Sequence, residues 1–188
     1  MTASRYSNAD LDKPARVQAL FSSIAGRYDL INDLQSFGFH RLWKRRVVSL
    51  ASVGPGSRAI DLCCGSGDIA EALAGTGAEV TGIDFNSAML DVARRRLGRR
   101  KDLRIRYEQG DALALPFDDG TFDAATMGYG LRNLADFDKG IAEALRLVRP
   151  GGRLVILDFG KPDSPTLRKI YFSYLRYFVP LLGAATCR

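Results

Sequence analysis

The sequence predicts a single α/β domain with a parallel, doubly wound sheet. From residue 58 onward, short apolar segments of strand length alternate with segments of helical periodicity, a pattern typical of parallel sheets covered by helices on both faces. The length of 188 residues suits one such domain, and a composition of 46% hydrophobic and 26% charged residues is that of a globular chain. We therefore expect one domain over residues 15–188, preceded by a flexible tail over residues 1–14.

A helical cover is expected at the start of this domain, over residues 15–53. Apolar residues at helical spacing predict helices over residues 15–25 and 40–52. A Gly-Pro-Gly sequence at residues 54–56 ends the second helix, because neither residue type continues a helix well.

The central sheet is expected over residues 54–160. The five expected strands cover residues 58–62, 80–83, 103–108, 122–127 and 153–159. The helices between them are expected at residues 68–73, 87–97 and 135–148. Ser87 is expected to cap the second of these helices, and a Pro-Gly-Gly sequence at residues 150–152 to close the third.

An aromatic and basic helix is expected near the end of the chain, within residues 161–188. Helical periodicity covers residues 164–182 and includes three basic side chains. Five aromatic residues fall close together there: Tyr171, Phe172, Tyr174, Tyr177 and Phe178. This face suits either attachment to a membrane surface or packing, against the sheet or in a homodimer.

The cysteines do not predict a disulfide framework or a metal centre. Cys63, Cys64 and Cys187 are an odd number without an extracellular context, and His40 is the single histidine. Zinc sites take about four N, S or O ligands at recognisable spacings, which are missing here. We expect no metal, and we interpret Cys63 and Cys64 as small packing residues.

A glycine-rich turn follows the first expected strand, where open α/β sheets bind ligands. Gly65, Ser66 and Gly67 form this turn, and glycine lets the backbone approach a ligand closely. A dinucleotide-binding turn would carry a third glycine three residues later, where Ala70 stands. Because the looser form of that motif accepts alanine, the turn alone leaves a nicotinamide cofactor open.

Three acidic residues at strand ends favour another cofactor. Asp61 would repel a pyrophosphate but suits a cationic amino-acid ligand. Asp84 ends the second strand, where a carboxylate accepts hydrogen bonds from ribose hydroxyls, and Asp111, followed by Ala112, suits an adenine amino group. Each acid alone is as well explained by a cap or a turn, but together they predict S-adenosylmethionine.

Several longer stretches then point to one family. They are FSSIAGRYDLINDLQSFGFHRLWKRR at residues 21–46, DLCCGSGD at 61–68, GIDFNSAML at 82–90, GDALALPF at 110–117 and GYGLRNLADF at 128–137. With the Tyr-Asp-x-x-Asn element that begins at Tyr28, they make the chain resemble the ubiquinone/menaquinone-biosynthesis C-methyltransferases of the UbiE type.

This resemblance implies a Rossmann-like class I fold and S-adenosylmethionine as the cofactor. It implies cofactor contacts at Ser66, Asp84, Asp111 and Ala112. Gly128 stands where many relatives have serine, so no side-chain contact is carried over to it. Cys63 and Cys64, at positions that take small residues in the family, are expected beneath the methionine end of the cofactor, without thiolate chemistry.

The implied reaction is C-methylation of a polyprenylated quinol, such as demethylmenaquinol to menaquinol or its ubiquinone counterpart. Arg132 and Asn133 are expected to stabilise the phenolate. Tyr28 and Asp29 are expected to close over the cofactor or take part in proton transfer. The plain alternative for Arg132 is a surface ion pair with Asp136.

His40 is the other candidate base. A lone histidine that opens a basic helix is more often a cap or a surface group, and we expect that role here.

The charge distribution suits a substrate that is dissolved in a membrane. Residues 1–50 and 161–188 each carry a net charge of +4, and residues 51–160 carry −2. Basic, aromatic-rich flanks favour peripheral contact with an anionic membrane. Nucleic acid is not expected, because no recognition motif accompanies the charge. Without a signal sequence or a membrane span, we expect a cytoplasmic protein, either free in the cytoplasm or peripheral on the inner face of the membrane.

Two alternatives stay open at this point. Class I sheets usually have seven strands, and only five are found, so the last two are expected to be missing. The chain would then either be an active enzyme, on a quinol or on a soluble small molecule, or bind the cofactor without turnover.

Overall fold

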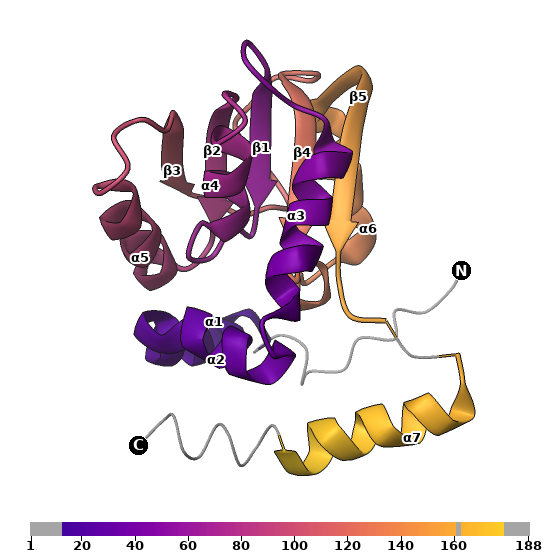
Figure 1. The fold of residues 1–188 in the computed structure, drawn as a ribbon. Coiled ribbons are helices and arrows are strands. Elements are labelled where there is room, and N and C mark those ends of the chain that lie inside the picture. The colour runs from indigo at the N-terminus through magenta and orange to yellow at the C-terminus, as the bar shows by residue number, and fades with distance from the viewer. Residues whose placement is uncertain (1–12, 161–162, 179–188) are drawn as a thin grey trace.

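The computed structural model describes residues 13–160 and 163–178 and contains a five-stranded, fully parallel sheet (Figure 1). The strands are β1 (Arg58–Leu62), β2 (Glu79–Asp84), β3 (Ile105–Gln109), β4 (Phe122–Gly128) and β5 (Val148–Leu157). Their order is β3-β2-β1-β4-β5. The direction of winding therefore reverses between β1 and β4, and ligands bind at such a reversal in open α/β sheets. The α/β fold with a doubly wound parallel sheet is confirmed.

Seven α-helices are described. They are α1 (Lys13–Ile24), α2 (Tyr28–Ser36), α3 (Phe39–Ala51), α4 (Asp68–Ala74), α5 (Ser87–Leu97), α6 (Phe137–Leu147) and α7 (Pro165–Ser173). Helices α3, α4 and α5 cover one face of the sheet and α6 covers the other (Figure 1). None of the helices within the described residues is both long and apolar enough to cross a membrane.

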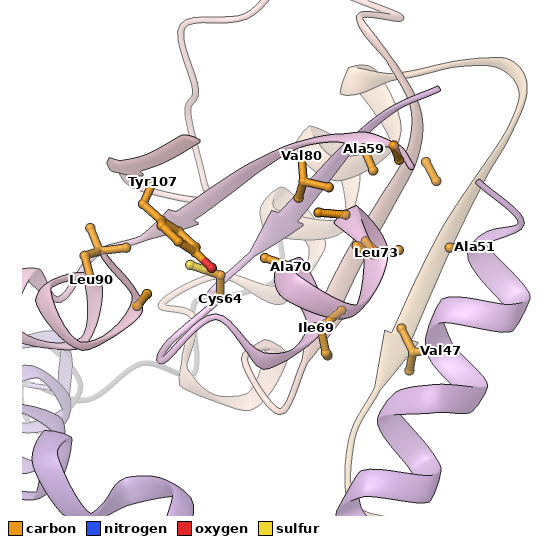
Figure 2. Close-up of a cluster of buried hydrophobic side chains, with 14 residues drawn as sticks. Val47, Ala51, Ala59, Cys64, Ile69, Ala70, Leu73, Val80, Leu90 and Tyr107 are labelled. Carbon is orange, nitrogen blue, oxygen red and sulfur yellow. The ribbon is translucent and has the colours of Figure 1, made fainter. Parts of the chain in front are cut away.

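On each face of the sheet, apolar side chains of the strands and of the covering helices pack together to form the core. On the α3, α4 and α5 face, Leu73, Leu90 and Val47 meet the side chains of β1, β2 and β3 (Figure 2). Tyr107 of β3 lies across this cluster and reaches Cys64, just after β1 (Figure 2). The face covered by α6 is filled by larger apolar side chains, among them Phe122 and Leu147.

Helices α1 and α2 lie across the carboxyl ends of the strands, with α7 beyond them (Figure 1). A tight turn joins α2 to α3, with left-handed backbone at Phe37 (φ 50°) and Gly38 (φ 76°). The Tyr174 hydroxyl, in the single π-helical turn that follows α7, donates to the Gln35 carbonyl (2.5 Å). The N-terminal cover thus lies over the edge of the sheet where a ligand would bind.

Several expected boundaries were wrong. Asn86, and not Ser87, caps α5, because its side chain accepts from the Met89 amide (3.2 Å) while Ser87 already lies in the helix. Residues 150–152 belong to β5 instead of closing a helix, since a bulge between Phe122 and Ala124 absorbs the extra residues.

Other differences concern the ends of the chain. Helix α1 begins at Lys13, inside the expected tail, of which residues 1–12 lie outside the described part. The helix expected over residues 164–182 is shorter: Ser164 caps α7, regular α-helix ends at Ser173, and residues 179–188, including Cys187, are not described.

Candidate cofactor and active site

A cavity of about 170 Å³ opens at the carboxyl ends of the strands. Its floor comes from the loops after β1, β2, β3 and β4, and α1 and α2 supply its roof through Val17, Phe21 and Tyr28. A smaller cavity of about 30 Å³ adjoins it. The two share five wall residues: Tyr28, Cys63, Gly65, Gly128 and Tyr129.

The turn after β1 has an unusual backbone. Cys63 (φ 54°), Gly65 (φ 56°) and Gly67 (φ 88°) all adopt left-handed conformations, which glycine tolerates and cysteine rarely adopts. A β-carbon on Gly67 would also lie 2.2 Å from the Tyr107 hydroxyl oxygen. Gly65 lines both cavities, whereas Gly67 packs against the core.

Asp84 is fixed in the wall of the large cavity at the end of β2. One carboxylate oxygen accepts from the Gly65 amide (2.7 Å) and the other from the Asn86 amide (2.8 Å). Burial raises the pKa of Asp84 above its ordinary value, although these amide bonds oppose the rise. Each oxygen keeps a second lone pair, so the carboxylate remains an acceptor for a ligand.

Asp111 and Ala112 lie in the same wall, after β3. One oxygen of the exposed Asp111 carboxylate accepts from the Leu113 amide (2.9 Å), which orients the side chain. Ala112 is buried, and its small side chain does not project far into the cavity. The structure thus brings Asp84, Asp111 and Ala112 together, as the sequence predicts.

Asp61 and Ser66 line only the smaller cavity. Asp61 is 1% exposed, and one of its oxygens accepts from the Thr126 hydroxyl (2.7 Å). Its other oxygen, Oδ2, is buried without a hydrogen-bond partner among the described residues. Burial raises the pKa of Asp61 to about 7.

Asn133 lines the large cavity and its amide nitrogen donates to the Tyr129 carbonyl (3.3 Å). Arg132, the residue before Asn133, lines neither cavity, and its guanidinium lies 4.8 Å from the Phe159 ring centre. The partner that the plain alternative gave to Arg132, Asp136, is not the one observed. Arg132 pairs with Asp158 (3.0 Å), while Asp136 caps α6.

Tyr28 lines both cavities, and its ring packs edge-on against Phe21, with ring centres 5.8 Å apart. Asp29 belongs to α2, but its side chain lies outside the described part of the chain. The structure therefore places Tyr28 at the site and leaves the role of Asp29 a prediction.

His40 is neither a cap nor a surface group, contrary to expectation. It is 4% exposed and its Nε2 forms a hydrogen bond with Asp33 Oδ1 (2.8 Å), which Arg41 also contacts. The tight turn at Gly38 folds the first turn of α3 back onto α2, and this buries the ring. His40 lines neither cavity and so joins the two cover helices.

A comparison with protein-family models decides the family. The model of the ubiE/COQ5 methyltransferase family matches residues 9–187. The chain belongs to this family.

Two curated relatives show how closely this ubiE/COQ5 methyltransferase resembles known members. It is 44% identical to the demethylmenaquinone methyltransferase of Desulfitobacterium hafniense, over 92% of this chain and 70% of the relative. It is 47% identical to the 2-phytyl-1,4-naphthoquinone methyltransferase of Synechococcus elongatus, over 93% of this chain and 77% of the relative.

The fold of the ubiE/COQ5 methyltransferase is also found among solved structures. An S-adenosylmethionine-dependent methyltransferase from Aquifex aeolicus superposes with a TM-score of 0.61 at 20% identity, over 73% of this chain and 75% of the other. The Rossmann-like class I fold that the sequence predicts is confirmed.

Several wall residues of the ubiE/COQ5 methyltransferase were missed by reasoning from the sequence. Tyr129 lines both cavities, Lys44 lines the smaller one, and Asn86 contributes to the larger. Of these, only Lys44 could have been identified from the sequence, since it follows His40 by one helical turn and shares its face of α3.

The paired cysteines have separate environments in this methyltransferase. Cys64 is buried in the core against Tyr107 and borders only the smaller cavity, whereas Cys63 lines both cavities. Burial raises the pKa of both thiols, so they stay protonated near neutral pH. Their roles are therefore those of packing and wall residues.

Proposed function

We propose that this chain transfers a methyl group from S-adenosylmethionine to a ring carbon of a polyprenylated quinol in menaquinone or ubiquinone biosynthesis. The carrying observation is Asp84, a carboxylate held by two backbone amides in the wall of a cavity at the reversal of strand order. The names of the two relatives favour a naphthoquinol acceptor, such as demethylmenaquinol.

The wall residues fit the cofactor at both of its ends. Asp84 would accept from the ribose hydroxyls and Asp111 from the adenine amino group. The buried Oδ2 of Asp61 has no partner and would accept from a cationic amino-acid group, together with the polar wall at Ser66. When bound, S-adenosylmethionine supplies an electrophilic methyl group on a sulfonium.

The apolar part of the large cavity suits the acceptor ring. Val17, Phe21, Leu113 and Leu134 form this part of the wall. They exclude water from the space between ring and cofactor site, which strengthens electrostatic interactions there.

Polar groups at its rim would stabilise the phenolate that makes the ring carbon nucleophilic. The Asn133 amide has one N–H beyond the bond to the Tyr129 carbonyl, and Arg132 adds positive charge beside it. Tyr28 lines both cavities, and its hydroxyl would relay a proton.

Contact with a membrane surface belongs to this proposal, because the acceptor carries an isoprenoid tail. Large apolar side chains are exposed on α2, on α7, in the turn before α3 and at the first residue of α3: Leu30, Phe37, Phe39, Leu167 and Ile170. Helices α2 and α7 lie on the same side of the molecule as the carboxyl ends of the strands (Figure 1). We expect the chain to float with anionic vesicles in a density gradient and not with neutral vesicles. Recovery of the chain in the vesicle-free fraction with both kinds of vesicle would contradict membrane contact.

The reaction itself is tested with purified chain, methyl-labelled S-adenosylmethionine and short-tailed demethylmenaquinol or demethylated benzoquinol in detergent. We expect label on a ring carbon of the naphthoquinol, detected by mass spectrometry. Cofactor binding without product from either quinol would reject the proposed acceptor class.

A further inference from the structure

The smaller cavity contains a lysine that the proposed function has not used. Lys44 projects from α3 into this wall, and its side chain is only 12% exposed. Its ammonium contacts Asp68 Oδ2 (2.6 Å). Long cationic side chains are rarely this deeply buried without a reason beyond stability, because removing the charge from water is costly.

The ion pair with Asp68 does not depend on Lys44 alone. Arg96 of α5 contacts the other Asp68 oxygen at 2.6 Å. Burial opposes ionisation of Asp68, yet Lys44 and Arg96 together hold its pKa below the ordinary value. If Lys44 turned to another anion, Arg96 would still neutralise Asp68, so no carboxylate would be left buried and unpaired.

The same wall offers two polar atoms that lack partners among the described residues. They are Asp61 Oδ2 and the Tyr129 hydroxyl, both buried. A cation, a buried carboxyl group and a hydroxyl therefore face one small space that joins the larger cavity. Matching them requires a ligand end that carries a positive and a negative group together, as an α-amino acid does.

We propose that Lys44 binds the α-carboxylate of S-adenosylmethionine, moving from Asp68 to the cofactor, while Asp61 Oδ2 accepts from the α-ammonium. This inference rests on the proposed cofactor and adds a residue from the helical cover to its binding site. Because Lys44 belongs to α3, the cover is then held against the cofactor by a charge-assisted hydrogen bond. The carboxylate, and not the adenosine, is the part of the ligand that Lys44 recognises.

Calorimetric titration of the full chain with a set of nucleosides tests this directly. S-adenosylmethionine and S-adenosylhomocysteine carry the α-carboxylate, whereas decarboxylated S-adenosylmethionine and methylthioadenosine lack it. For the wild type, decarboxylated S-adenosylmethionine should bind about 10- to 100-fold more weakly than S-adenosylmethionine, the loss of one charge-assisted bond. Lys44→Met should weaken the two carboxylate ligands by a similar factor and leave the other two unchanged.

Arg45→Met is the matched control. Arg45 is the next residue of α3 and is exposed, so the same loss of charge should leave all four affinities unchanged. Lys44→Arg keeps the positive charge and should restore most of the affinity for the carboxylate ligands.

Three results would overturn the inference. Equal wild-type affinity for S-adenosylmethionine and its decarboxylated form would do so without any variant, even if Lys44→Met failed to fold. A folded Lys44→Met chain that binds all four ligands like the wild type would also do so, as would one that weakens all four equally. Failure of the wild type to bind any of the ligands would instead reject the proposed cofactor.

Discussion

Gly67 and Tyr107 are packed so closely that a single methyl group on Gly67 would come within 2.2 Å of the phenol oxygen. Gly67 ends the turn after β1, and Tyr107 belongs to β3, two strands away in the sheet. The tyrosine ring therefore packs directly against the glycine turn. The position of the turn at the cofactor site is fixed by packing from a strand that is distant in sequence.

Gly67→Ala should destabilise the fold by about 2–4 kcal/mol, because it adds both a clash and an unfavourable left-handed backbone. Urea unfolding measures this. Gly56→Ala is the control, since Gly56 has a similar φ of 84° but open space around it, and it should cost only about 1 kcal/mol.

Removing the phenol oxygen should relieve part of that cost. The Tyr107 hydroxyl is buried without a partner among the described residues, so Tyr107→Phe alone should not destabilise the chain. In the double variant, Gly67→Ala should cost at least about 1 kcal/mol less than in the wild-type background. If the free-energy costs of the two substitutions simply add, the contact with the phenol oxygen is not what makes alanine unfavourable in the turn.

Asp61 should make stability fall as pH rises from about 4 to 7. Burial raises its folded-state pKa from 3.8 to about 7, so the folded chain holds a proton that the unfolded chain releases in this range. The effect amounts to about 4 kcal/mol at most. Stability relative to Asp61→Asn should therefore decline between pH 4 and 7 and then level off; a difference that does not vary with pH would contradict the raised pKa.

Arg132→Ala should lower kcat for quinol methylation by about 10- to 100-fold while leaving S-adenosylmethionine affinity unchanged, because in the proposed mechanism its charge, next to Asn133 of the cavity wall, stabilises the developing phenolate. Steady-state kinetics and calorimetry separate the two effects. Arg149→Ala serves as the control, since Arg149 forms an ion pair with Asp123 near the start of β4, at the opposite end of the strands from the cavities. Normal kcat in Arg132→Ala would remove this residue from the mechanism.

His40→Gln should reduce stability by about 1–3 kcal/mol through loss of the buried contact with Asp33. The pH profile of kcat should keep its shape, because the ring lines neither cavity. A profile that loses its basic or acidic limb would instead assign His40 to proton transfer.

Element boundaries show one limit of prediction from the sequence. Asn86 and Ser87 are both good capping residues, so sequence preference alone did not distinguish them, and the actual cap depended on which side chain reaches the Met89 amide. Residues 150–152 look like a helix stop, yet pairing with β4 draws them into β5 through a bulge. In both cases a tertiary contact outweighs a local preference.

The sequence by itself determined the alternation of strands and helices, and with it the positions of Asp84, Asp111 and the glycine turn. Parallel strands place their carboxyl ends at one edge, so residues that follow them meet whatever the remaining packing is. Only the tertiary structure decided that His40 is buried, that Arg132 pairs with Asp158, and that Lys44 reaches the smaller cavity. These depend on how the helical cover and β5 pack against the sheet, which is set by contacts between segments that no local pattern relates.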